Sequence, residues 1–145
     1  MKYLSTMITL MLLICGIAIM SCSDDENNGV SYLGPDETES AIVGTWIREV
    51  VKDYNYAGLS FFSDGTYYYV NMSSPTSEPY ASREGAYTID GKTLTLGSDD
   101  ASCSSAGIYE VSISEDMDQM TLKKTDDDCE VRSGELPGNW QFVEE

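Results

Sequence analysis

Short runs of alternating apolar and polar residues fill most of the chain and are separated by turn sequences. The clearest case is 59–72, where two runs rich in aromatic and β-branched residues flank Asp64-Gly65. This dipeptide readily adopts the positive φ angles of a tight hairpin turn. A second hairpin is predicted at 85–97, with its turn at Asp90-Gly91. The pattern therefore predicts antiparallel hairpins rather than helices or βαβ units.

Further strands are predicted on both sides of these two hairpins. A first strand follows Trp46, a third hairpin joins 108–114 to 119–125, and 139–143 is the candidate for a last strand. About eight strands then occupy about a hundred residues, in line with ordinary strand and turn lengths. The predicted class is all-β, an antiparallel up-and-down meander. A sheet of this size closes on itself or folds into a sandwich, which protects its edges.

The N-terminus predicts an export signal. Met1-Lys2 and an apolar run at 4–20 have the basic start and hydrophobic centre of a secretory signal peptide. A permanent transmembrane anchor is the alternative, since the run is almost long enough to span a bilayer. Ile19-Met20-Ser21-Cys22 resembles the bacterial lipobox, although Met20 departs from the usual small or branched residue. The resemblance implies a signal peptide at 1–21 and lipid modification of Cys22, which would anchor the chain to a membrane.

A polar segment follows Cys22 and separates it from the predicted domain. Residues 23–40 are mostly Ser, Asp, Glu, Asn, Gly and Pro, and they contain too little apolar surface to offset chain entropy. We therefore expect a flexible acidic tether at 22–40 and a single domain at 41–145. Ser23-Asp24-Asp25-Glu26 resembles the surface-export signal of Bacteroidota outer-membrane lipoproteins, which implies an outer-membrane protein exposed on the cell surface. The alternative interpretation is a solvated linker.

Composition narrows the function classes. The chain has 25 acidic and 8 basic residues, a formal net charge of −17 and no histidine. The charge repels phosphate backbones, so nucleic acid is not expected as a partner. Absence of histidine excludes serine–histidine, cysteine–histidine and histidine–zinc chemistry. Among the strand carboxylates Glu49, Glu84 and Glu110, no pair has contrasting environments, so neither an enzyme nor a cofactor is expected.

Cys103 and Cys129 are predicted to form a disulfide. If Ser114 pairs with Gln119 in the third hairpin, the register places the two cysteines nearly opposite each other. In an oxidising compartment this geometry favours a bond. A reactive thiol is the alternative, but no histidine or lysine cluster is present to lower its pKa.

The same register brings a group of carboxylates to one end of the sheet. Asp99 and Asp100 come from one side of it, and Asp126, Asp127 and Asp128 come from the other. Five carboxylates would suit calcium, whose ligands are oxygens. No EF-hand spacing is present, however, and acidic loops are usually only hydrated. No metal site is therefore expected.

Several motifs resemble the small lipocalin-like (calycin-type) domain of Bacteroidota lipoproteins. The matching positions are Gly44-Thr45-Trp46, Leu59-Ser60-Phe61 with Asp64-Gly65-Thr66, Gly85-Ala86-Tyr87 through Leu94-Thr95-Leu96, and Met120-Thr121-Leu122. They span most of 41–125 and are mainly turn and strand signals. The resemblance implies that the sheet closes as a barrel of about eight strands, shorter than a full lipocalin.

Tyr67, Tyr68 and Tyr69 are the candidate contact residues. Rigid amphipathic rings suit a sugar, a flat apolar ligand or a protein partner, although tyrosine is also simply a good strand former. The first hypothesis is a cell-envelope binding module whose barrel mouth or tyrosine patch holds a small apolar molecule or a saccharide. The alternative is an envelope interaction or structural lipoprotein with a filled barrel. A filled interior with an exposed aromatic patch would favour the second.

Overall fold

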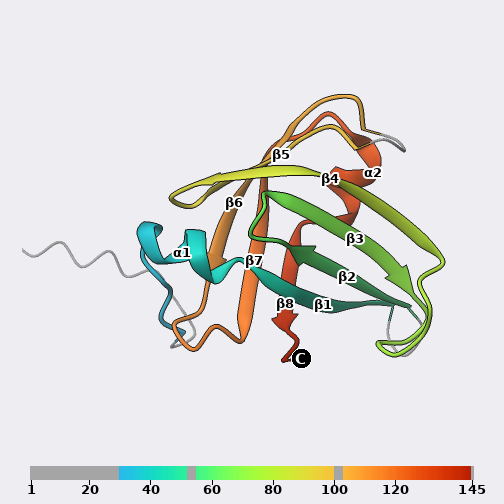
Figure 1. The fold of residues 1–145 in the computed structure, drawn as a ribbon, viewed down its shortest axis with the longest axis horizontal. Coiled ribbons are helices and arrows are strands. Elements are labelled where there is room, and N and C mark those ends of the chain that lie inside the picture. Colours follow the sequence, from blue (N-terminus) through green and yellow to red (C-terminus); the bar gives the residue numbers. More distant parts are fainter. Residues whose placement is uncertain (1–29, 52–54, 100–102, 145) are drawn as a thin grey trace, which may run out of the picture.

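Eight antiparallel strands form a closed barrel in the computed structural model, which describes residues 30–51, 55–99 and 103–144 (Figure 1). Each strand pairs with the next along the chain, and β8 closes the barrel against β1. The strands are β1 (Gly44–Val51), β2 (Asn55–Phe61), β3 (Thr66–Met72), β4 (Ala81–Asp90), β5 (Thr93–Leu96), β6 (Gly107–Ile113), β7 (Gln119–Asp126) and β8 (Gly138–Phe142). The all-β meander and its closure as a barrel are confirmed.

The turn chemistry of the β2–β3 hairpin explains its position. Gly65 has a φ of 83°, and the carboxylate of Asp64 accepts hydrogen bonds from both the backbone N–H and the hydroxyl of Thr66. Asp and Gly are favoured in such turns because one caps the backbone and the other accepts a positive φ at little cost. The turn fixes the register that places Ser60 beside Tyr68.

Large side chains fill the barrel. Inward-facing residues of all eight strands belong to one buried cluster, which alternates along the strands with outward-facing polar residues. The fully buried members with the largest side chains are Trp46, Trp140, Tyr67, Tyr109, Phe61, Ile42, Leu59, Leu94, Leu96, Ile113 and Met120. Eight strands enclose just enough space for such a set. The interior is therefore a packed core.

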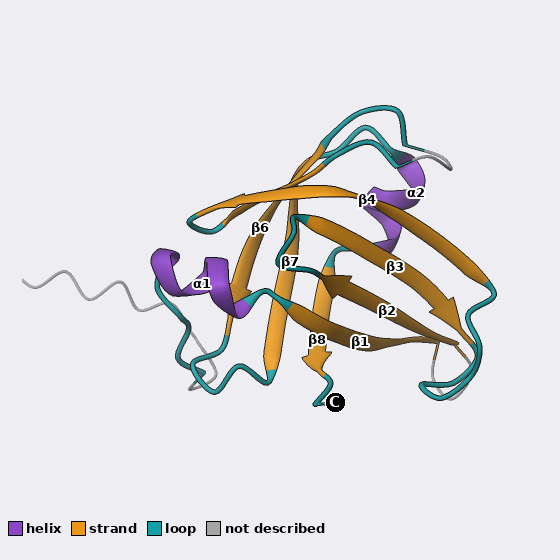
Figure 2. Ribbon diagram, in the orientation of Figure 1, coloured by secondary structure: helices purple, strands orange, loops and turns teal. Residues whose placement is uncertain are grey.

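Two short helices lie at opposite ends of the barrel (Figure 2). Helix α1 (Pro35–Ala41) precedes β1, and helix α2 (Glu130–Glu135) precedes β8. Since β1 and β8 are antiparallel neighbours, the two helices lie at opposite ends. Helix α1 packs near β4 and β6 and buries Thr38 completely. We call the two ends of the barrel the α1 end and the α2 end. The described residues contain no helix long and apolar enough to cross a bilayer, and the apolar run at 4–20 is not among them.

Helix α1 corrects the predicted tether. Residues 35–40 were expected to be flexible, but they are helical because Pro35 fits the first helical position and Glu37 accepts a hydrogen bond from the backbone N–H of Gly34. The preceding residues are also paired, since the N–H of Leu33 donates to Ile113. The tether prediction is wrong for this segment, and the folded part begins before residue 41.

The seam between β1 and β8 contains the same local arrangement twice, related by an approximate two-fold axis. In each strand a glycine of large positive φ, Gly44 or Gly138, precedes a buried tryptophan by two positions. The indole N–H of Trp46 donates to the carbonyl of Ile42, four residues earlier, at 2.9 Å. That of Trp140 donates to Leu136, also four residues earlier, at 3.1 Å. Each arrangement thus ties one short helix to the wall of the barrel.

Candidate functional site

The tyrosine run of β3 is divided between the two faces of the barrel. Tyr67 and Tyr69 point inward and are each 2% exposed, whereas Tyr68 is half-buried on the outer face. Burial raises the pKa of Tyr69 to about 12, and the neighbouring Glu135 carboxylate adds to this rise. The structure therefore does not bring all three candidate residues together: Tyr68 and Tyr67 line one groove, with Tyr68 the more exposed, and Tyr69 lies in the core.

Tyr68 lines a groove on the outside of the barrel, which we call the Tyr68 groove. Its volume is about 480 Å³ and it is open to solvent. The lining residues are Phe62, Thr66, Tyr67, Tyr68, Glu84, Gly85 and Ser98. Tyr68 and Glu84 are cross-strand partners of β3 and β4, and Glu84, Thr66 and Ser98 are exposed. The groove thus combines aromatic rings with hydroxyl groups and one carboxylate.

A second groove lies on the other side of Phe62, which we call the Phe142 groove. It is also open, has a volume of about 560 Å³ and lies between the start of β1, the β2–β3 turn and the C-terminal residues. The lining residues are Val43, Gly44, Thr45, Ser60, Phe61, Phe62, Ser63, Asp64, Phe142 and Val143. Its walls are mostly apolar, while the hydroxyls of Thr45 and Ser60 are hydrogen-bonded to each other at 3.0 Å. This groove therefore offers apolar surface with few free polar groups.

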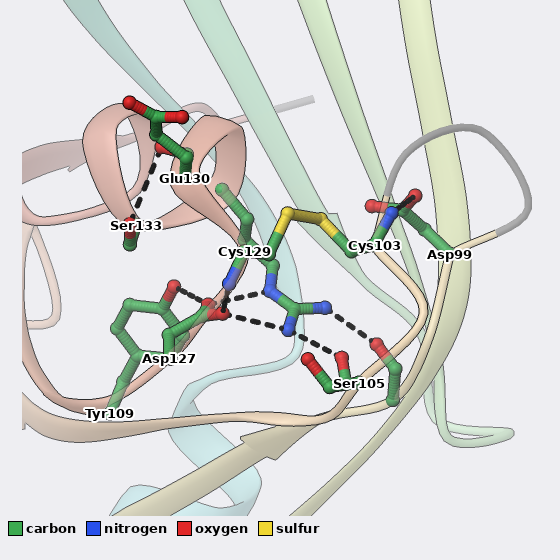
Figure 3. Close-up of polar contacts among 10 residues, drawn as sticks. Asp99, Cys103, Ser105, Tyr109, Asp127, Cys129, Glu130 and Ser133 are labelled. Atoms are coloured by element: carbon green, nitrogen blue, oxygen red, sulfur yellow. Dashed lines mark hydrogen bonds and ion pairs between the residues drawn. A yellow bond between two sulfur atoms is a disulfide. The ribbon is translucent and has the colours of Figure 1, made fainter.

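The α2 end is closed by a buried ion pair between α2 and the end of β7 (Figure 3). The Arg132 guanidinium donates to the Asp127 carboxylate at 2.7 and 3.1 Å and to the carbonyls of Gly97 and Ser105 at 2.7 Å. Tyr109 donates its hydroxyl proton to the same carboxylate. Burial opposes the charge of Asp127, but these hydrogen bonds and that from the Cys129 amide hold its pKa below the usual value.

The other two arginines of the chain also lie at the α2 end. Arg48 donates to the carbonyls of Pro137 and Glu135, and its guanidinium lies 4.7 Å from the ring centroid of Trp140. Arg83 pairs with the Glu135 carboxylate and lies over the Tyr69 ring. All three arginines of a strongly acidic protein thus hold α2 against the barrel instead of facing solvent.

The disulfide between Cys103 and Cys129 is confirmed. Its Cα atoms are 5.3 Å apart. The predicted hairpin register is confirmed as well, since Ile113 pairs with Met120 and the N–H of Ser114 donates to the carbonyl of Gln119. The bond ties the residue that precedes α2 to the loop after β5. It therefore reinforces the same closure as Arg132.

The carboxylates at this end do not form a metal centre in the described part of the chain. Asp127 is committed to Arg132, and Asp99 accepts a hydrogen bond from the backbone N–H of Cys103. Asp126 and Asp128 are exposed, and Asp100 lies outside the described residues. No group of three or more potential metal ligands occurs among the residues that the structure describes. Cys22, the predicted lipidation site, also lies outside them.

Comparison with known proteins identifies the fold and nothing finer. The barrel is similar to a solved structure titled "NMR structure of the protein from Bacteroides thetaiotaomicron VPI-5482". The two share 15% sequence identity with a TM-score of 0.57, and the match covers 81% of this chain and 100% of the other. No family model and no curated protein matches. At this identity the likeness extends to the fold alone.

The sequence predicted Tyr68 as a candidate contact residue but did not predict most of the surface around it. Phe62 and Phe142 are about half and two-fifths exposed, and they lie in one groove although 80 positions separate them in the chain. The strand pattern contained a partial signal for Phe62, because Leu59 and Phe61 share a face and leave Phe62 on the other side. Closure of the barrel was predicted, but nothing in the pattern gave the register of the last strand against the first, which brings Phe142 beside Phe62.

Proposed function

We propose that this chain is a lipid-anchored outer-membrane protein with a lipocalin-like barrel that binds a saccharide on its outer face, in the Tyr68 groove. The observation that carries the proposal is the combination of Tyr68 and Phe62 with Glu84, Thr66 and Ser98 in one open groove. Aromatic rings pack on the C–H faces of sugars, and carboxylates and hydroxyls bond to sugar hydroxyls. Lipidation at Cys22 and exposure at the cell surface are part of the proposal.

The packed core argues against a ligand inside the barrel and by itself favours the protein-interaction alternative. The hydroxyl and carboxylate groups beside Tyr68 are what favour a saccharide on the outer face. A small apolar ligand inside the barrel would have to displace fully buried side chains such as Tyr67 and Leu59, at a cost of several kcal/mol. An open groove leaves much of an apolar ligand in water, but it suits a saccharide, whose hydroxyls remain hydrated. The net charge of −17 favours neutral or amino sugars over acidic ones.

Glycan binding by the full chain tests the proposal. The protein is purified from its own membranes in detergent and applied to an array of neutral, amino and acidic saccharides. Its affinity for the strongest ligand is then measured by calorimetry. We expect Tyr68→Ala to weaken binding at least about tenfold, or about 1.4 kcal/mol. Glu84→Gln should weaken it less, because it removes charge but retains an acceptor and a donor.

Tyr80→Ala is the matched control, because Tyr80 is an exposed tyrosine in the β3–β4 loop that does not line the groove. We expect it to leave the affinity unchanged. If the folded wild-type chain binds no saccharide, or if Tyr68→Ala and Tyr80→Ala have equal effects, the proposal is wrong. The first of these outcomes would favour an envelope protein as the partner.

A further inference from the structure

The exposed large hydrophobic residues are concentrated at the α1 end. Of seven such residues in the described part of the chain, four lie there: Val43 (38% exposed), Phe62 (49%), Met117 (51%) and Phe142 (38%). They form one surface. Val43, Phe62 and Phe142 all line the Phe142 groove. Met117 lies beside them, because the backbone N–H of Phe142 donates to the carbonyl of its neighbour Asp118. We call this set the apolar rim. Leaving a contiguous set of this kind in water is unfavourable unless something covers it.

Met117 adds an independent indication that the rim has a role. It lies in the turn between β6 and β7 with a φ of 58°, and it is the non-glycine residue of the described chain with a positive φ. Glycine or asparagine occupies this region at lower cost than methionine does. An unfavourable backbone angle combined with an exposed apolar side chain points to a contact that the isolated barrel does not make.

The segment that precedes α1 pairs with the β6–β7 turn, beside Met117. The hydroxyl of Ser31 donates to the Glu115 carboxylate at 2.6 Å, and the N–H of Glu115 donates to the carbonyl of Ser31 at 3.0 Å. Tyr32 forms a β-bridge with Ser114. Ser31 is nine positions after Cys22, so the two are at most about 32 Å apart even with the chain fully extended. A lipid on Cys22 therefore holds the α1 end within reach of the bilayer.

We propose that the apolar rim is a membrane-contacting surface that rests in the interfacial layer of the bilayer to which Cys22 is anchored. The inference rests on the anchoring part of the proposed function. It shares Phe62 with the saccharide groove, but it is tested at Met117 and Phe142, which do not line that groove. Exposed Phe, Met and Val side chains gain by leaving water for the headgroup and acyl boundary. The barrel then stands with its α2 end away from the membrane and its Tyr68 groove facing sideways.

The charges around the rim define the lipid it fits. Glu115, Asp116 and Asp118 share the turn with Met117, and Asp64 and Glu144 lie beside the other rim residues. All five are carboxylates. They repel anionic headgroups, so the rim suits a zwitterionic surface such as phosphatidylcholine or phosphatidylethanolamine.

Photo-cross-linking from the bilayer tests the proposal. The mature chain is placed in phosphatidylcholine vesicles that contain a phosphatidylcholine with a diazirine on its acyl chain, and the labelled peptides are quantified by mass spectrometry after illumination. We expect peptides that contain Met117 or Phe142 to carry at least about fivefold more adduct than peptides that contain Tyr80 or Val131, because only the rim reaches the acyl boundary. Adding anionic phosphatidylglycerol should lower the rim adducts. Equal labelling of both ends, or stronger labelling of the α2 end, overturns the proposal.

Met117→Asn is the variant that separates contact from folding, because asparagine accepts a positive φ. We expect it to reduce adducts on the peptide that contains Phe142 at least about twofold, as loss of one buried apolar side chain weakens the contact. Val131→Ser, at the α2 end, should not reduce them.

The mass of the peptide that contains Cys22 is determined before these measurements. If it is not acylated, the anchoring proposal is wrong, and coupling its thiol to a maleimide-bearing lipid then tests the rim alone. Unchanged rim labelling in Met117→Asn contradicts the rim proposal in either case.

Discussion

The two ends of the barrel share one local arrangement and differ in the residue that covers the tryptophan. At the α1 end the ring of Phe142 packs edge-on against Trp46, with ring centroids 5.1 Å apart. At the α2 end the guanidinium of Arg48 covers Trp140. Each covering side chain comes from the opposite strand of the β1–β8 seam, two residues after the tryptophan of its own strand.

This one difference accounts for much of the contrast between the ends. A guanidinium needs acceptors, and the carbonyls of Pro137 and Glu135 supply them only when α2 lies against the barrel. A phenyl ring needs no acceptor, so Phe142 stays at the surface and lines a groove. The α2 end is therefore closed by polar contacts, whereas the α1 end exposes apolar surface.

The largest effect is expected from Arg132→Met. The substitution leaves the buried Asp127 carboxylate without its cationic partner and removes the donor to the carbonyls of Gly97 and Ser105. Loss of one partner from a buried ion pair costs about 3–5 kcal/mol. The free energy of unfolding in urea measures it. Lys123→Met is the control, because Lys123 forms an exposed pair with Glu110 and should contribute less than about 1 kcal/mol. Equal losses in the two variants would contradict the assignment.

Loss of the disulfide is expected to have the next largest effect. The double substitution Cys103→Ser with Cys129→Ser opens a link between residues 26 positions apart. On the chain-entropy model this costs about 3–4 kcal/mol. The same loss should follow when the wild-type protein is unfolded in a reducing agent, and the reducing agent should not change the stability of the double variant. A stability that is insensitive to reduction would show that the bond does not reinforce the α2 end.

Acid should weaken the α2 end through Asp127. Its pKa is held below the usual value in the folded protein, so its contribution to stability is complete above about pH 4 and is lost as pH falls through the lowered pKa. Asp127→Asn lacks this ionisation. The difference in unfolding free energy between wild type and Asp127→Asn, measured from pH 7 to pH 2, should therefore shrink on acidification. A constant difference would contradict the assignment.

The sequence predicted what depends on neighbours along the chain. Asp64-Gly65 located a hairpin, and the predicted register of the third hairpin holds from Tyr109 to Ile113. A bulge at Ile108 shifts it by one residue, which still leaves Cys103 close enough to Cys129 for the predicted bond. Helix α1 was missed although Pro35 gave a start signal, because seven residues are too few for a helical period to show. Helix α2 has only six residues and includes Gly134.

The candidate site was predictable only in part, because its surfaces join residues that are distant in the chain. Tyr68 was identified from an aromatic run in a single strand. The arginine contacts of α2 and the meeting of Phe62 with Phe142 depend on closure of the barrel, which brings the last strand beside the first. The intrinsic preferences of a strand carry no information about such contacts.

Substitution of either seam glycine, Gly44 or Gly138, by alanine is expected to lower the free energy of unfolding by about 1–3 kcal/mol, because both have a large positive φ. A Cβ at Gly44 would lie 2.5 Å from the Phe142 ring, and one at Gly138 would lie 2.6 Å from the Arg48 guanidinium. Phe142→Ala should therefore reduce the cost of Gly44→Ala but not that of Gly138→Ala. A double-mutant cycle in urea measures both. Additive costs at Gly44 and Phe142 would show that the ring does not constrain the glycine.

The smallest effect, and the only stabilising one, is expected from Met117→Asn. Asparagine accepts the φ of 58° more easily than methionine, so the free energy of unfolding of the soluble barrel should rise by about 0.5–1 kcal/mol. Gln119→Asn, in β7 just beyond the turn, is the control and should give no gain. If the stability rises while lipid contact falls, then methionine at this turn lowers the stability of the barrel in exchange for contact with the membrane. If the stability does not rise, the backbone at Met117 is not strained, and the rim proposal then rests on exposure and the tether alone.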